Sequence, residues 1–259
     1  MGETKAFYEE SRENIEAISN DGDLKKLSNQ WIQKSAKHKW SYNFSWLGRP
    51  AIQFPNDTWA MQELIWTVKP DLIIETGIAH GGSLIFSASM LAILDYTDAC
   101  KNETVLDPVK STRKVLGLDI DIRSHNKKAI EDHPLSNLIE MIEGSSTDPS
   151  IIAKVKEISS NFRTVMVCLD SNHTHDHVLE ELRAYAPLVS ENSYCVVFDT
   201  GIEDMPEGSF PNRPWDKGNN PKTALYEYIK ENPEFHIEKS ISDKLCITVA
   251  PEGFLKRAK

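Results

Sequence analysis

The chain has 259 residues, 40% of them hydrophobic, which is enough to bury the core of one large α/β domain. Its 39 Asp and Glu residues outnumber its 29 Lys and Arg residues, and the formal charge of -10 disfavours a nucleic-acid partner. No apolar run approaches the roughly 20 residues that cross a bilayer, and the charged start MGETKAFYEESREN is unlike a signal peptide. We therefore expect a cytoplasmic protein that has no membrane span.

Polar helical patterns at residues 7–19 and 23–36 open the chain, and an aromatic connector broken by prolines leads to a helix at 58–68. We expect residues 1–69 to form a helical and aromatic cap, followed by one domain at 70–259. The pattern leaves open whether the cap covers the functional site or forms a surface of a homo-oligomer.

From residue 72 onwards, short apolar runs alternate with helical patterns. Continuous apolar runs of this kind predict the buried strands of a parallel sheet that is covered by helices on both faces. The predicted strands are 72–75, 115–118, 138–142, 165–169 and 194–198, and the predicted helices are 83–95, 127–132, 149–158, 176–185 and 222–231.

The last third of the chain breaks this alternation. FHIEKS and LCITVA are separated only by ISDK, which is too short for a helical crossover, so we expect an antiparallel hairpin. The whole pattern predicts a doubly wound, seven-stranded Rossmann-like α/β sheet with an antiparallel C-terminal hairpin. This arrangement resembles the class I fold of S-adenosylmethionine (SAM) methyltransferases.

The segment LIIETGIAHGGS at 72–83 carries the strongest chemical signal. Glu75 lies at the carboxyl end of the first predicted strand of the sheet, where doubly wound sheets bind ligands. Gly77 and Gly81 permit a tight turn, and Ser83 begins a helix whose free N–H groups favour a carboxylate. The spacing fits the methyltransferase pattern E-x-G-x-x-x-G-x-S better than the dinucleotide pattern GxGxxG, and we expect these four residues to bind SAM. The alternative is a turn that packing alone requires.

Polar residues also follow the next two predicted strands. VLGLDID ends in Asp119, whose carboxylate can accept both ribose hydroxyls of a nucleoside, with Asp121 as the alternative. EGSSTD places Ser145 and Ser146 at the following strand end, where we expect them to contact adenine.

The predicted chemical centre follows the fourth strand, in CLDSNHTHDH. A sugar hydroxyl is a poor nucleophile until it is deprotonated, so methyl transfer to it benefits from a general base or a metal ion. We expect His173 to act as the base and Asp170 to lie at the methyl group of the cofactor, as a metal ligand or an orienting carboxylate. His175 and His177 are interpreted as polar residues around a helix N-terminus.

The fifth predicted strand ends at Asp199, which lies beside Asp170 if the two strands are neighbours. Two carboxylates suit Mg²⁺ better than zinc, which prefers sulfur and nitrogen ligands. The alternative is that Asp199 caps a turn through Thr200 and Gly201.

Several longer segments carry a family resemblance. WLGRPAIQFPND, KPDLIIETGIAHGGS, LGLDID, LDSNHTHDHVLEELRAYAPLVSENSYCVVFDT and NRPWDKGNNPKTAL resemble the cephalosporin hydroxylase family, with its CmcI-type methyltransferases. More distantly, the chain is similar to metal-dependent macrolide-sugar and catechol O-methyltransferases. The resemblance covers roughly residues 45–250 and implies a SAM-dependent methyltransferase fold despite the hydroxylase name.

In such relatives an aspartate after the fourth strand binds Mg²⁺ and a His or Lys three residues later acts as base, which implies these roles for Asp170 and His173. The second metal position is usually a pair of ligands after the fifth strand, but here Phe198 precedes Asp199. Either Glu203 or Asp204 supplies the missing ligand, or the histidine acts without a metal.

These patterns predict a SAM-dependent O-methyltransferase with a sugar or nucleotide-sugar substrate. The enzymatic alternative is a non-haem metal hydroxylase, which needs two histidines and a carboxylate. The alternative of another class is a non-catalytic SAM-binding subunit. A long loop with Arg213 and Trp215 is a candidate lid in which Trp215 stacks on a sugar ring. The alternative is a surface loop in which Trp215 serves only the packing of the loop itself. The aromatic connector before the first strand of the sheet, with Trp46, Gln53 and Asp57, is expected to close the opposite side of the pocket.

Overall fold

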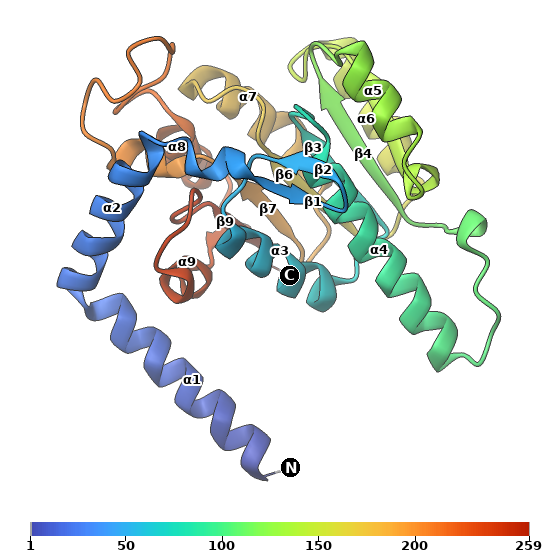
Figure 1. The fold of residues 1–259 in the computed structure, drawn as a ribbon, viewed down its shortest axis with the longest axis horizontal. Coiled ribbons are helices and arrows are strands. Elements are labelled where there is room, and N and C mark those ends of the chain that lie inside the picture. The colour runs from blue at the N-terminus through green and yellow to red at the C-terminus, as the bar shows by residue number, and fades with distance from the viewer. Residues whose placement is uncertain (1, 259) are drawn as a thin grey trace.

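A computed structural model describes residues 2–258 and is built around a seven-stranded sheet in the order β5-β4-β3-β6-β7-β9-β8 (Figure 1). The first five strands in this order are parallel, and β9 runs antiparallel to both of its neighbours. The predicted fold class is therefore confirmed. The strands are β3 (Leu72–Thr76), β4 (Lys114–Asp119), β5 (Ile139–Glu143), β6 (Val165–Leu169), β7 (Tyr194–Val197), β8 (Phe235–Ile237) and β9 (Phe254–Arg257).

The last strand is not the predicted one. LCITVA, residues 245–250, was expected in the ladder, but β8 is followed by the short helix α9 (Lys239–Leu245) and the chain pairs only later, as β9. Two features, one in the backbone and one a contact with a distant residue, keep LCITVA out of the sheet. Cys246 has φ +59, which a strand does not allow, and the backbone N–H of Val249 donates to the buried carboxylate of Asp57 at 3.0 Å.

Helices cover both faces of the sheet, as its continuous apolar strands require. On one face, α3 (Pro55–Val68), α4 (Gly82–Lys101) and α5 (Ser124–Glu131) share a core with the sheet. On the other face lie α6 (Pro149–Ser159), α7 (His175–Tyr185) and α8 (Pro221–Glu231). The apolar side chains of each strand alternate between these two cores, which fixes the strand register and therefore the positions of the strand ends.

Helix α4 is the one helix of the described residues that is long and apolar enough, by length and composition alone, to cross a membrane. Half of its most apolar window is buried inside the domain. It packs against the sheet, as expected for a core helix (Figure 1).

The N-terminal region consists of α1 (Gly2–Asn20), which extends away from the sheet, α2 (Gly22–Ala36) and a small hairpin (Figure 1). The strands of the hairpin are β1 (Phe44–Trp46) and β2 (Arg49–Ala51). Leu47 and Gly48 form its two-residue turn and both have positive φ, the geometry that matches the twist of paired strands. The indole N–H of Trp46 donates to Ser89 Oγ at 3.0 Å, which holds the hairpin on α4. This hairpin lies in the segment that was expected to be an irregular aromatic connector.

Candidate active site

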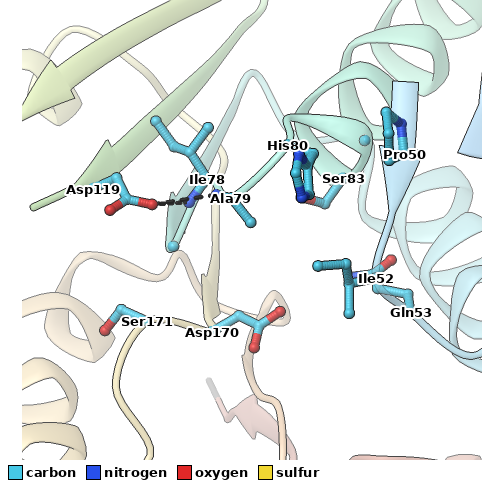
Figure 2. Close-up of a pocket in the computed structure, with 12 residues that line it drawn as sticks. Pro50, Ile52, Gln53, Ile78, Ala79, His80, Ser83, Asp119, Asp170 and Ser171 are labelled. Carbon is cyan, nitrogen blue, oxygen red and sulfur yellow. Dashed lines mark hydrogen bonds between the residues drawn. The ribbon is translucent and has the colours of Figure 1, made fainter. Parts of the chain in front are cut away.

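The candidate site is a cavity at the carboxyl ends of β3, β4 and β6 (Figure 2). β3 and β6 are adjacent, and the strand order reverses between them, which is the position where doubly wound sheets bind ligands. The wall comes from the hairpin and the segment after it, the glycine turn, and the ends of β4 and β6. It comprises Pro50, Ile52, Gln53, Gly77, Ile78, Ala79, His80, Gly82, Ser83, Asp119, Asp170 and Ser171.

The glycines of the turn are required by close packing against the protein itself. A Cβ atom on Gly77 would lie 2.1 Å from the carbonyl oxygen of Asp170, and one on Gly82 would lie 2.3 Å from that of Pro50. Gly81 has φ +82 and faces the side chain of Ile130 in α5. Gly77 and Gly82 also line the cavity, whereas Gly81 does not. The glycines are thus needed for packing, and two of them also lie at the cavity.

Glu75 lies behind the cavity wall. It is buried and accepts a hydrogen bond from the hydroxyl of Ser83, which does line the cavity. Burial raises the pKa of Glu75 to about 8, and the Ser83 hydrogen bond only partly opposes this effect. Glu75 is therefore mostly protonated at neutral pH. It does not line the cavity itself, but its hydrogen-bond partner Ser83 does.

Asp119 lines the cavity and holds the glycine turn at the same time. Its Oδ2 accepts the backbone N–H groups of Ile78 at 2.8 Å and Ala79 at 3.2 Å (Figure 2). Its Oδ1 accepts the N–H of Asp121 at 3.1 Å. Asp119, and not Asp121, belongs to the wall.

Neither of the two serines expected at adenine, Ser145 and Ser146, lines the cavity. Ser146 is buried, and its hydroxyl is 3.0 Å from Nε2 of His177. That nitrogen is also 3.2 Å from the hydroxyl of Ser171, which lines the cavity. Ser145 pairs with the hydroxyl of Thr147 at 3.0 Å. The serine of this network that reaches the cavity is Ser171, which the sequence analysis missed although it follows Asp170 directly.

Arg49 in β2 binds the glycine turn, and the sequence analysis missed it as well. Its guanidinium donates to the carbonyl oxygen of His80 from Nε at 3.0 Å and from Nη2 at 2.6 Å. Nη2 also donates to Asn126 Oδ1 at 3.1 Å, and Asn126 Nδ2 donates to the carbonyl oxygen of Ala79 at 3.0 Å. The hairpin, the turn and α5 are thereby joined. A single arginine in RPAI offers no sequence signal for this role.

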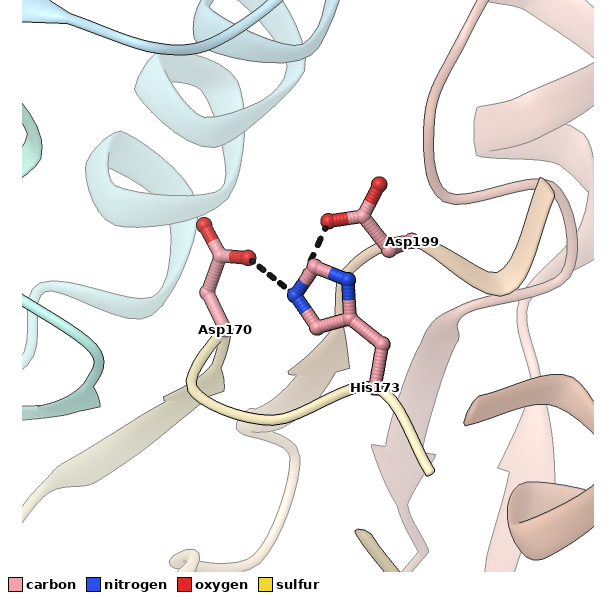
Figure 3. Close-up of side chains that lie close together, drawn as sticks. All are labelled: Asp170, His173 and Asp199. Atoms are coloured by element: carbon pink, nitrogen blue, oxygen red, sulfur yellow. Dashed lines mark ion pairs between the residues drawn. The ribbon is translucent and has the colours of Figure 1, made fainter. Parts of the chain in front are cut away.

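Asp170, His173 and Asp199 meet at one edge of the cavity (Figure 3). Nε2 of His173 lies 3.6 Å from Asp170 Oδ1 and 3.3 Å from Asp199 Oδ2. The two carboxylates converge because β6 and β7 are neighbours in the sheet. Asp199 has φ +55, a left-handed conformation in which its side chain reaches the histidine.

The electrostatics of this cluster favour a positive charge between the carboxylates. Burial raises the pKa of Asp170 to about 7, and the charge of Asp199 adds to this effect. Burial lowers the pKa of His173, but Asp199 and Asp170 outweigh it and raise that pKa to about 9. The imidazole is therefore protonated at neutral pH when no other cation lies between the two carboxylates.

The same three residues fit a divalent metal ion. One ligand atom from each lies within 4.8 Å of the others, and two carboxylates with one imidazole suit Mg²⁺ or Mn²⁺.

Phe198, at the position where relatives carry a second metal ligand, is buried in the core and offers no ligand. Glu203 accepts the N–H of Gly218 at 2.8 Å, and Asp204 pairs with Lys222 at 2.7 Å. Both proposed replacement ligands are therefore engaged elsewhere.

The other histidines of this segment have structural partners. His175 Nδ1 lies 2.8 Å from Thr223 Oγ1 in α8. His177 Nε2 lies within hydrogen-bond distance of the hydroxyls of Ser146 and Ser171. The cluster thus holds one histidine and two carboxylates, whereas the facial triad of a non-haem iron hydroxylase needs two histidines and one carboxylate.

Asp57 does not close the pocket as expected. It is fully buried and binds Thr248 and Val249 in the segment before β9. Of the connector residues expected there, Gln53 does line the cavity, whereas Trp46 does not and instead binds Ser89.

Comparison with known proteins gives the following matches. A model of the family described as Rhamnosyl O-methyltransferase/CmcI matches residues 38–258. A rhamnosyl O-methyltransferase of Mycobacterium tuberculosis (strain ATCC 25618 / H37Rv) is 28% identical over 228 residues, which cover 85% of this chain and 83% of that protein. One from Mycobacterium leprae (strain TN) is also 28% identical over 228 residues and covers 85% and 88%.

Solved structures agree on the fold. A CmcI structure with Mg and SAM is 16% identical and has a TM-score of 0.55, over 84% of this chain and 78% of that chain. An apo-structure of CmcI is 16% identical with a TM-score of 0.53, over 84% and 77%. These two structures support the class I methyltransferase fold.

Proposed function

The chain belongs to the Rhamnosyl O-methyltransferase/CmcI family, and we propose that this SAM-dependent O-methyltransferase acts on a sugar hydroxyl of a nucleotide-linked or surface-glycan precursor. The sequence relatives are rhamnosyl O-methyltransferases, and this name supports a deoxysugar acceptor. The observation that carries the proposal is the position of the Asp170–His173–Asp199 cluster. It adjoins a cavity whose wall already contains Gly77, Ser83 and Asp119.

We propose that SAM lies across the carboxyl ends of β3 and β4. Its carboxylate would lie at the turn from Gly77 to Ser83, where the start of α4 presents free N–H groups. Its ribose would bind Asp119, and its adenine would lie toward Ser171, with Ser146 behind it. This pose directs the methyl group toward Asp170 and His173.

In the proposed reaction, the acceptor oxygen attacks the methyl carbon of SAM. The new O–CH₃ bond forms as the S–CH₃ bond breaks, and the products are a methyl ether and S-adenosylhomocysteine. Neutral His173 takes the hydroxyl proton on Nε2, the ring atom that Asp170 and Asp199 both face.

Asp170 and Asp199 would hold Mg²⁺, with His173 beside them. When bound, the ion lowers the pKa of a coordinated hydroxyl and neutralises the two carboxylates. With their charge neutralised, the carboxylates would no longer raise the pKa of His173, and the ring would be neutral and able to accept the proton.

A methyl-transfer assay tests the proposal. We expect radiolabelled methyl from SAM to appear in a nucleotide-linked deoxyhexose or a lipid-linked glycan, and not in catechols. Binding of S-adenosylhomocysteine without transfer to any glycan would instead indicate a non-catalytic SAM-binding subunit. His173→Ala is expected to keep the affinity for S-adenosylhomocysteine and to slow turnover by about 100-fold, the usual size of a general-base contribution.

We also propose that a second copy of the chain packs against the N-terminal helices. α1 runs away from the sheet (Figure 1) and contacts the domain at α9. Phe7 and Tyr8 are exposed on it. Light scattering of the full chain and of the double variant Phe7→Ser/Tyr8→Ser tests this expectation. A monomeric mass for the unmodified chain contradicts it.

A further inference from the structure

Trp215 lies against the catalytic histidine. The ring centroids of Trp215 and His173 are 4.7 Å apart, with an angle of 42° between the ring planes. The guanidinium carbon of Arg213 lies 5.1 Å from the centroid of the indole. The indole thus contacts an imidazole and a guanidinium of the protein itself, so the sugar-stacking role expected from the sequence does not account for its contacts.

The loop that carries Trp215 is held in place by bonds that do not involve the indole. Glu203 accepts the N–H of Gly218 at 2.8 Å, and Asp216 accepts the N–H of Gly208 at 2.7 Å. The side chain of Asn219 donates to the carbonyl oxygen of Pro214 at 2.9 Å. The indole therefore has a defined position relative to the sheet, and its removal leaves these loop contacts intact.

His173 needs such support because its two carboxylate partners contact a single ring atom. Both Asp170 and Asp199 face Nε2, so rotation of the ring plane about that contact is not restrained by them. The terminal torsion of a histidine has broad minima, and a neighbouring ring is needed to select one orientation. The packed indole supplies that restraint.

We propose that Trp215 is a positioning residue that fixes the ring plane of His173, so that Nε2 keeps its direction toward Asp170, Asp199 and the acceptor hydroxyl. This inference rests on the proposed role of His173 as the base. It assigns to the loop at 205–219 a part in the chemical step, beyond covering the acceptor.

Steady-state kinetics of Trp215→Ala and Trp215→Phe test the inference. We expect Trp215→Ala to lower kcat by about 10- to 100-fold, the effect of a misplaced catalytic group, with KM for the acceptor and affinity for S-adenosylhomocysteine unchanged. Trp215→Phe, which keeps an aromatic face, is expected to restore most of kcat. A raised acceptor KM with an unchanged kcat would show that the indole binds the sugar, and would overturn the proposal.

Phe210→Ala is the matched control, because Phe210 is the other aromatic residue of this loop and has no aromatic partner among the described residues. We expect this variant to keep the kcat of the unmodified chain. An equal loss of kcat in Phe210→Ala would mean that general disturbance of the loop, and not the contact with His173, causes the effect.

A second measurement does not depend on turnover. In metal-free protein labelled with ¹³C at the histidine Cε1, the indole should displace the proton signal of His173 through its ring current. His173→Asn identifies that signal. We expect Trp215→Ala to remove the displacement and broaden the signal, and Phe210→Ala to leave it unchanged. A signal that is identical in Trp215→Ala and the unmodified chain would overturn the proposal even if no acceptor were found.

Discussion

Gly77 packs directly against the backbone of Asp170: a Cβ atom at residue 77 would lie 2.1 Å from the Asp170 carbonyl oxygen. The end of β3 and the end of β6 therefore touch at the point where the strand order reverses. This contact links the proposed cofactor turn to the proposed catalytic aspartate.

Gly77→Ala is predicted to destabilise the protein and to displace Asp170. Gly48 is the matched control, because its φ of +86 is close to the +90 of Gly77 while a Cβ there would meet nothing within 4 Å. Gly48→Ala should lower the unfolding free energy by about 1–2 kcal/mol, the cost of placing a residue with a Cβ atom in a left-handed conformation. Gly77→Ala should cost clearly more in urea unfolding. Equal losses in the two variants would show that the contact with Asp170 relaxes without cost.

Asp119→Ala is predicted to weaken binding of S-adenosylhomocysteine by about 10- to 100-fold in calorimetry. The variant removes a charged acceptor of two turn N–H groups, and hydrogen bonds to charged groups contribute about 1.5–3 kcal/mol. Asp121→Ala is the control, since only its backbone N–H meets Asp119. A stronger effect of Asp121→Ala would assign the ribose contact to Asp121.

Arg49→Ala is predicted to lower the affinity for S-adenosylhomocysteine by about tenfold. The carbonyl oxygen of His80 loses its guanidinium donor, and Asn126, which binds the carbonyl oxygen of Ala79, loses its contact with Arg49. Arg49→Lys should recover part of the loss, since a lysine keeps the charge but not the forked geometry. The exposed Arg123, at the start of α5, is the control. Calorimetry that finds equal affinities for Arg49→Ala and Arg123→Ala would show that the turn holds its shape without the hairpin.

Removal of divalent metal with EDTA is predicted to abolish turnover, and Asp199→Asn to weaken Mn²⁺ binding by at least about tenfold, because the cluster loses one of two carboxylates. Mn²⁺ binding is measured by electron paramagnetic resonance without substrate. Glu207→Gln, an exposed acid of the neighbouring loop, should bind Mn²⁺ like the unmodified chain. Undiminished turnover in EDTA would mean that Asp170 and Asp199 act on His173 alone.

The stability of the protein is predicted to depend on the protonation of Glu75. Burial raises its pKa from 4.5 to about 8 in the folded chain, so the folded state holds a proton that the unfolded state has released. This contribution to stability is complete below about pH 4.5 and is lost as the pH rises toward 8. Its slope between these values is at most about 1.4 kcal/mol per pH unit.

Glu75→Gln keeps the side-chain shape and an acceptor for Ser83 but does not titrate. The unfolding free energies of Glu75→Gln and of the unmodified chain are measured in urea at pH 5, 6, 7 and 8. As the pH rises, the variant should become more stable relative to the unmodified chain. A difference that stays constant with pH would show that Glu75 is ionised in the folded protein.

Local patterns in the sequence were sufficient for most of the sheet. A strand such as Val165–Leu169 is apolar throughout because both of its faces are covered, and this signal does not depend on distant residues. The positions of Asp119, Asp170 and Asp199 followed from the same pattern, because parallel strands end at one edge of the sheet. The strand ends also implied that Asp199 lies beside Asp170, and the structure brings both carboxylates to His173.

These local patterns did not predict contacts between segments that are distant in the sequence. LCITVA has the composition of a strand, but Asp57, nearly two hundred residues earlier, binds Thr248 and Val249 and keeps the segment out of the sheet. The hydrogen bonds from Arg49 to the carbonyl oxygen of His80 and the packing of Trp215 on His173 also join segments that are distant in the sequence. The sequence alone determined which groups lie at the strand ends, because hydrophobic periodicity is local. Only the tertiary structure decided which side chains orient those groups, because hydrogen bonds and ring contacts depend on distances that folding creates.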